Sequence, residues 1–160
     1  MNDVYLDQLQ DIYSACKQSQ AATNELADAA SSPELKEALN AGSNGIAHGM
    51  TVAASVVRSH KSDPTDEFCK GMEGLVKEAE AHAIEADIRD PDARDAVIIT
   101  QYQRMVHYAI AGWGCVVAFA KRLGFEADAR DLQACLDDTY SGDRTMTEIA
   151  TGQVNKAASA

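Results

Sequence analysis

Long stretches of this chain carry apolar residues at steps of three and four, and the first of them is free of glycine and proline. It runs from Asp3 to Ala30 and contains this apolar stripe: Leu6, Leu9, Ile12, Tyr13, Cys16 and Leu26. Such steps place side chains on one face of a helix. The 160 residues also include 28 alanines, the best helix former, but only 3 Phe and 1 Trp. The sequence therefore predicts an all-α fold and argues against a β-sandwich.

Proline, glycine and small polar residues mark where the expected helices begin and end. Ser32-Pro33 and Asp90-Pro91 each place a capping residue before a proline, which is typical of a helix start. Gly124 is a C-terminal stop, and Thr65 or Asp66 would cap a third helix after a loop. We expect helices at about 3–30, 33–58, 66–86, 91–123 and 126–156, with a frayed tail at 156–160.

The lengths of these helices indicate how they pack. Four are long and form two hairpins, whereas the shorter third helix belongs to the connection between the second and fourth. This predicts a four-helix bundle with an additional shorter helix in a long crossover, which is the ferritin-like arrangement, although lengths and loops alone permit other four-helix topologies. We expect residues 1–160 to form a single helical domain.

The charge balance and the N-terminus exclude several classes of protein. A formal net charge of −11 and the lack of a basic cluster disfavour nucleic-acid binding, which depends on Lys and Arg. No apolar run is long enough to span a bilayer, and the acidic start is unlike a signal peptide. We expect a cytoplasmic protein without nucleic-acid or membrane partners.

Three glycines lie close together within the expected second helix. Gly42, Gly45 and Gly49 each cost about 1 kcal/mol relative to alanine in a helix interior. Either the helix is kinked there, or the glycines allow another helix or a ligand to approach closely.

Several strings follow one another in a characteristic order along the chain. They are Leu6–Ala15, Ser32–Lys36, Met72–Glu78, Arg94–Ala96, Gln103–Tyr108 with Ile110-Ala111, Leu136–Asp138 and Thr147–Ala150. Over roughly residues 4–152, this order resembles the YciF/YciE-like bacterial proteins of the ferritin-like superfamily. The resemblance implies a ferritin-like bundle, usually a homodimer, that is associated with bacterial stress responses and can hold a two-metal carboxylate centre.

The ligands of such a dimetal centre are largely missing from this sequence. A ferritin-like centre needs a Glu from each of two helices and a Glu-x-x-His pair from each of the other two. None of the four histidines follows a Glu at that spacing. By the resemblance, Cys16, Asn44, Val106 and Thr139 stand where the family places acids, while His107, Asp138 and Asp143 remain beside them.

We therefore interpret these seven residues as positions of a former metal site. Replacing the acids removes the repulsion and desolvation cost of a metal-free carboxylate cluster. We expect no cofactor and no catalytic residue, with an Fe or Mn dimetal centre as the alternative.

Other groups of ionisable residues can be interpreted either as sites or as ordinary surface and structural charges. Glu78, His82 and Glu85 would share a face of the third helix, where they either hold one divalent metal or form a solvated acidic surface. The acidic run from Asp87 to Asp95 lacks the spacing of a calcium-binding loop, so we interpret it as a helix cap with surface charge. His107 is either a ligand or acid–base residue or a hydrogen-bonded structural histidine.

The four cysteines show no metal-binding or disulfide spacing. Cys16, Cys115 and Cys135 fall on or near apolar stripes of different helices, so they could approach one another near the core. They either bind a soft metal or sense redox state, or, with Cys69, are inert thiols packed as small hydrophobic residues.

Three functions follow from these observations. The first is a metal-free, dimeric structural or interaction protein that is associated with the stress response. On this hypothesis we do not expect the protein to be an enzyme. The second is a binding protein for a small apolar ligand, in a cavity between the three glycines and small residues such as Ala109, Gly112 and Gly114. The third is a diverged metalloprotein that uses Cys16, His107 and Asp138.

Overall fold

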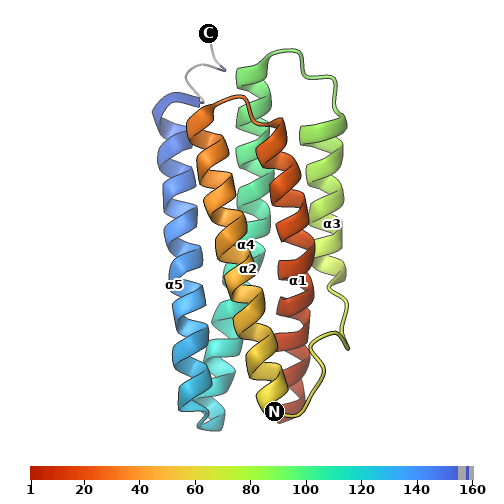
Figure 1. The fold of residues 1–160 in the computed structure, drawn as a ribbon, viewed down its shortest axis with the longest axis vertical. Helices are drawn as coiled ribbons and strands as arrows, with labels where there is room; N and C mark the ends of the chain where they lie inside the picture. Colours follow the sequence, from red (N-terminus) through yellow and green to blue (C-terminus); the bar gives the residue numbers. More distant parts are fainter. Residues whose placement is uncertain (155–157, 159–160) are drawn as a thin grey trace.

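The structure, a computed structural model, describes residues 1–154 and 158, and these residues form helices joined by short loops (Figure 1). The elements are α1 (Asn2–Ala29), α2 (Pro33–Ser59), α3 (Lys70–Ala79), η1 (Glu80–Glu85), α4 (Pro91–Leu123), α5 (Glu126–Ile149) and η2 (Ala150–Val154), where η marks π-helical turns. No strand occurs among these residues. Within the same residues, no helix combines the length and apolar character needed to cross a membrane.

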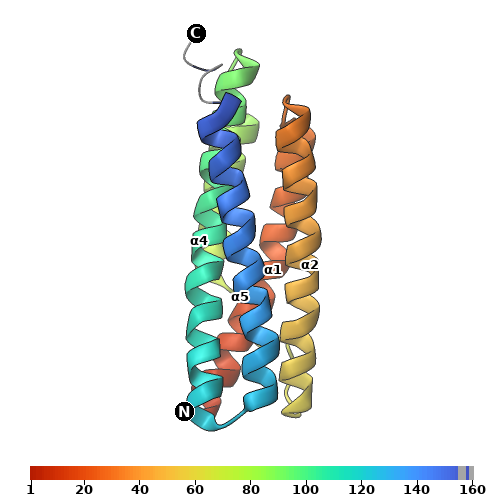
Figure 2. The same ribbon diagram turned by 90° about the vertical axis from the view of Figure 1, so that its left-hand side faces the viewer.

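The four long helices form a bundle of two antiparallel hairpins. Helices α1 and α2 form the first hairpin and α4 and α5 the second, with α1 packed against α4 and α2 against α5 (Figures 1 and 2). Helix α3 and η1 lie outside this square, against α1 and α4. The predicted all-α four-helix bundle with a shorter helix in its long crossover is confirmed.

Most helix ends lie where local signals placed them. The Ser32 hydroxyl accepts a hydrogen bond from the Leu35 amide at 3.4 Å, and the Asp90 carboxylate accepts one from the Asp92 amide at 2.9 Å. Gly124 follows α4 in the left-handed conformation, with φ of +78°. The predicted bounds of α1, α2 and α4 are confirmed to within one residue.

The predicted start of the third helix at Asp66 is wrong. Asp63 accepts hydrogen bonds from both the amide and the hydroxyl of Thr65, at 2.8 and 2.7 Å, and these bonds form a turn instead of a helix start. The helix begins at Lys70, and its cap is the Cys69 thiol, which accepts from the Met72 amide at 3.4 Å. The Cys69 amide itself donates to the Ser14 hydroxyl of α1, at 3.0 Å.

The second half of this helix also departs from the prediction, because it is π-helical from Glu80 to Glu85. Its C-terminal carbonyl groups need partners, since helix ends leave them unpaired. The Arg94 guanidinium supplies these partners. It donates at 2.9 to 3.4 Å to the carbonyl oxygens of four residues: Ala83, Ile84, Ala86 and Ile88.

Asp95 is not the surface charge that the acidic run predicted. Its side chain is buried, with 1% of the residue exposed, and its two oxygens accept the amides of Ser31 and Ser32 at 2.8 and 2.7 Å. The carboxylate thereby holds the turn between α1 and α2. Asp87, Asp90 and Asp92 are exposed, as expected.

The last helix ends earlier as an α-helix than predicted. Helix α5 passes Gly142 without interruption and ends at Ile149, after which η2 continues to Val154. The predicted end at Lys156 lies outside the described residues. So does the predicted tail at 156–160, apart from Ala158.

The buried core consists of two clusters stacked along the bundle. The cluster around Leu35, Ile98 and Met105 lies toward the α1–α2 turn, and the cluster around Leu9 and Leu132 lies toward the opposite end. The second cluster ends in a polar contact among three buried or half-buried residues: Asp128 accepts from the Tyr5 hydroxyl at 3.1 Å and lies 2.7 Å from His60 Nε2.

Candidate functional site

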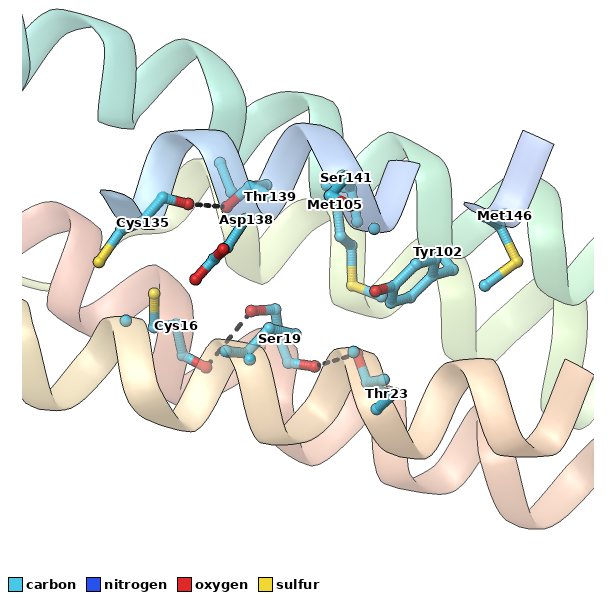
Figure 3. Close-up of a pocket in the computed structure, with 18 of the residues that line it drawn as sticks. Cys16, Ser19, Thr23, Tyr102, Met105, Cys135, Asp138, Thr139, Ser141 and Met146 are labelled. Atoms are coloured by element: carbon cyan, nitrogen blue, oxygen red, sulfur yellow. Dashed lines mark hydrogen bonds between the residues drawn. The ribbon is translucent and has the colours of Figure 1, made fainter. Parts of the chain in front are cut away.

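A pocket of about 340 Å³ lies at the boundary between the two core clusters, and all four long helices line it (Figure 3). Its floor comes from buried residues of α1 and α4, among them Cys16, Ser19, Thr23, Tyr102, Met105 and Val106. The pocket thus lies deep between the hairpins, in the middle of the bundle.

The pocket opens to solvent between α2 and α5. The lining residues that are exposed come from these two helices, and include Gly45 and His48 of α2 and Asp138 and Ser141 of α5. Small side chains on both helices keep this seam open. A molecule entering here would pass between the two hairpins.

The three glycines of α2 allow close approach and do not kink the helix, which is continuous through them. A methyl group at Gly42 would overlap the Tyr102 hydroxyl, and one at Gly49 would lie 3.1 Å from Cζ2 of Trp113. At Gly45, in contrast, a methyl group would meet nothing within 4 Å. The first and last glycines therefore make room for two aromatic side chains, and the middle one borders open space.

Tyr102 and Asp138 have no hydrogen-bond partner within the described part of the chain, and neither do the side chains of His48 and Ser141 at the mouth of the pocket. Tyr102 is 4% exposed, and its hydroxyl is directed into the pocket (Figure 3). Burial, with a smaller effect of Asp143, raises the pKa of Tyr102 to about 12, so the hydroxyl stays protonated. The Asp138 carboxylate points inward from α5, toward the side of the pocket that holds Ser19 (Figure 3).

Three of the hydroxyl groups around the pocket are already used as donors. Ser19 donates to the carbonyl oxygen of Cys16 at 3.3 Å, Thr23 to that of Ser19 at 2.7 Å, and Thr139 to that of Cys135 at 2.7 Å. Each oxygen keeps lone pairs that can accept a hydrogen bond. Toward a ligand, these groups therefore act as acceptors.

The two thiols of the pocket are chemically quiet. Burial raises the pKa of Cys16 to about 12 and that of Cys135 to about 11, so both are protonated near neutral pH and neither is a ready nucleophile or metal ligand. The predicted meeting of three thiols is wrong for Cys115, which is exposed on α4 and does not line the pocket.

The seven positions of the predicted former metal site divide into two groups. Cys16, Val106, Asp138 and Thr139 come together around the pocket. Asn44 is exposed and does not line it. His107, whose side chain is 63% exposed, pairs with Asp143 at 3.1 Å, likewise away from the lining. The hypothesis of a metal site made of Cys16, His107 and Asp138 therefore fails on geometry.

The residues of the pocket do not fit a dimetal centre. They offer one carboxylate, two protonated thiols and an exposed imidazole, whereas such a centre needs several carboxylates. Among the described residues, no three His, Cys, Asp or Glu side chains are grouped so that they could hold a metal ion. Glu78 and His82 form an exposed pair at 3.2 Å without Glu85, where the π-helical turns change the register.

Several lining residues were missed from the sequence although their spacing carries a signal. Ser19 and Thr23 follow Cys16 at steps of three and four, and Tyr102 lies one turn before Val106. Of the small residues predicted to border a cavity, Ala109 lines the pocket. Gly112 and Gly114 do not: a methyl group on Gly112 would overlap Ile12 of α1.

The chain matches known proteins over nearly its full length. The family model described as "Domain of unknown function (DUF892)" matches residues 1–159. Protein YciF of Escherichia coli (strain K12) is 33% identical over 159 residues, which make up 99% of this chain and 95% of YciF.

Two solved structures share the fold. The crystal structure of E. coli YciF, which is called a stress protein, has a TM-score of 0.90 and 33% identity over 97% of each chain. YcfI from Rhodopseudomonas palustris has a TM-score of 0.86 and 28% identity over 92% of each chain. The resemblance seen in the sequence is thereby confirmed: this chain belongs to the DUF892 family of YciF-like proteins.

Proposed function

We propose that this protein is a metal-free, non-enzymatic member of its family that binds a small, largely apolar molecule in the pocket of the bundle core. The observation that carries the proposal is the position of the pocket. It is lined by four residues, Cys16, Val106, Asp138 and Thr139, that occupy or adjoin positions where the resemblance places metal-binding acids. On this proposal, part of the space that the resemblance assigns to a metal centre is available to an organic ligand.

The size and lining of the pocket support this proposal. Its volume of about 340 Å³ is within the lower range of small-molecule sites, and roughly twice that of a ~150 Å³ apolar cavity that accepts benzene. Met105, Val106 and Trp113 provide apolar walls, and the unpartnered Tyr102 hydroxyl provides a polar anchor. Mostly apolar walls with a small number of directed polar groups are typical of ligand sites.

The chemistry of the pocket favours binding over catalysis. A general acid–base pair needs two groups that titrate near neutral pH within reach of one another. Here the Cys16 and Cys135 thiols have raised pKa values. The one carboxylate and the one imidazole among the described lining residues, Asp138 and His48, both lie at the exposed mouth, and no hydrogen bond or ion pair joins them.

A pair of glycine substitutions tests the proposal. Gly45→Leu places a side chain at the mouth of the pocket, whereas Gly114→Leu places the same side chain on α4 away from it. Both replace a helical glycine whose surroundings are open, so both are expected to raise stability by roughly 1 kcal/mol. Binding of 2-phenylethanol can be followed by the fluorescence of Trp113, the single tryptophan of the chain.

We expect Gly45→Leu to weaken 2-phenylethanol binding at least tenfold and Gly114→Leu to leave it unchanged. Equal effects of the two substitutions, or no saturable binding to the natural sequence, would refute the proposal. Elemental analysis of protein purified without a tag tests its other half: about two Fe or Mn per chain, the content of a dimetal centre, would contradict a metal-free protein.

A structural role in the stress response is the second candidate. It is favoured by the relatives, since E. coli YciF is called a stress protein and YcfI is provisionally described as a structural protein. For this chain it implies the predicted homodimer, which analytical ultracentrifugation would detect. A dimer that retains the core pocket but binds no organic probe would favour this candidate.

A further inference from the structure

We propose that the ligand of the core pocket is a small organic amine, whose positive charge pairs with Asp138 and whose apolar body lies between α1, α2 and α4. The inference rests on the proposed function and adds the chemical class of the ligand. Four features of the pocket carry it: its one carboxylate, its acceptor groups, the unpartnered tyrosine hydroxyl and its apolar walls.

Asp138 supplies the negative charge. Its carboxylate lies at the edge of the pocket, points inward, and has no hydrogen-bond partner within the described residues. The neighbouring Asp137 is exposed, as Asp138 is, but it does not line the pocket, and it accepts the Gln133 amide at 3.0 Å. Asp138 is therefore the acidic group of this stretch that remains available to a ligand.

The hydroxyl groups around the pocket add acceptors. Those of Ser19, Thr23 and Thr139 donate to carbonyl oxygens of their own helices, at 2.7 to 3.3 Å, which leaves their lone pairs for a ligand. An ammonium group has three donors and no acceptor, so it complements a carboxylate flanked by such oxygens.

The Tyr102 hydroxyl is the second polar group that the pocket offers to a ligand. Most of the Tyr102 side chain is buried, but its oxygen borders the open space of the pocket, since every fully buried side-chain nitrogen or oxygen among the described residues has a hydrogen-bond partner. This hydroxyl is directed into the pocket and has no hydrogen-bond partner among the described residues. A ligand N–H, or a water molecule that the ligand displaces, would satisfy it.

The remaining walls suit an apolar or aromatic body. Met105 and Met146 direct thioether groups toward the space, and Trp113 packs beneath Gly49. Aromatic faces and polarisable sulfur also tolerate a nearby cation. No Lys or Arg occurs among the described lining residues, and the chain carries a net charge of −11, so an anionic ligand is disfavoured.

Three probes of similar shape test the charge preference. They are 2-phenylethylamine, 2-phenylethanol and phenylacetate, which are cationic, neutral and anionic at neutral pH. We expect the natural sequence to bind the amine about fivefold more tightly than the alcohol, as for a partly exposed ion pair, and the carboxylate most weakly. Asp138→Asn should remove the advantage of the amine, while Asp137→Asn, the matched control, should preserve it. Tyr102→Phe should weaken the amine and the alcohol alike.

The outcomes separate this inference from the proposed function. If the amine and the alcohol bind equally and Gly45→Leu blocks both, the pocket binds ligands but the proposal of an amine is wrong. The same conclusion follows if Asp137→Asn and Asp138→Asn have equal effects. If none of the probes binds, the proposed function and the inference fall together.

Discussion

The three glycines of α2 should respond differently to one substitution, Gly→Ala. In a helix interior this change stabilises by about 0.8–1 kcal/mol when the new methyl group meets nothing. That condition holds at Gly45, because a methyl group placed there would have no side chain and no neighbouring helix within 4 Å. We therefore expect Gly45→Ala to raise the free energy of unfolding by about 1 kcal/mol and the Tm by roughly 2–4 °C.

At Gly42 the same methyl group would overlap the Tyr102 hydroxyl, and the ring carbon Cζ would lie 3.0 Å away. Overpacking of this kind costs about 1–3 kcal/mol, so the net change at Gly42 should lie between roughly zero and a loss of ~2 kcal/mol. The change in the free energy of unfolding for Gly49→Ala should lie between those for Gly45→Ala and Gly42→Ala, because Cζ2 of Trp113 would be 3.1 Å from the new methyl group.

A double-mutant cycle measures the contact directly. Tyr102→Phe removes the overlapping oxygen, so it should relieve part of the cost of Gly42→Ala, with a coupling energy of about 1 kcal/mol. The assay is urea unfolding followed by circular dichroism for the four proteins of the cycle and for Gly45→Ala. If Gly42→Ala stabilises as much as Gly45→Ala, close packing against Tyr102 is not the reason for the glycine.

Three further predictions concern stability and thiol reactivity. Asp95→Ala should lower the free energy of unfolding, measured in urea, by about 2–4 kcal/mol, because the amides of Ser31 and Ser32 lose a charged acceptor. The control Asp92→Ala should lower it by less than ~1 kcal/mol. Similar losses for the two variants would contradict this role of the buried Asp95 carboxylate. In native protein, a thiol reagent should modify Cys115 rapidly and Cys16 only after unfolding, and fast native labelling of Cys16 would overturn its inert assignment. Because the pKa of Cys16 is raised from 9.0 to about 12, unfolding releases a proton between these values, and stability should fall as pH rises from about 9 to 12. Cys16→Ala should make this fall shallower, and an unchanged slope would contradict the assignment.

Helix ends could be predicted where the signal lies within one turn of sequence. Ser32 caps α2 and Gly124 ends α4 through contacts with residues close by. The start of α3 could not be predicted in this way. Its cap is Cys69, a residue type that is not a usual cap, and the Cys69 amide is held by the hydroxyl of Ser14 in α1, 55 positions away.

The candidate site could be predicted only in part, for a similar reason. Cys16 and Val106 face the pocket, as their places on apolar stripes imply. His107 follows Val106 and is rotated from it by about 100° around the helix, so both cannot face the core. The unpartnered Tyr102 hydroxyl could not be foreseen, since its isolation depends on the packing of all four helices.

The first turn of α4 has a consequence for local unfolding of the bundle. Arg94 holds the last carbonyls of the crossover, and the next residue, Asp95, holds the turn between α1 and α2. Two segments that are distant in sequence are thus fastened to adjacent positions of one helix, so loosening of that helical turn would release both. In hydrogen-exchange terms, the amides of Ser31 and Ser32 should exchange together with the end of the crossover as one cooperative unit, despite their place in a loop.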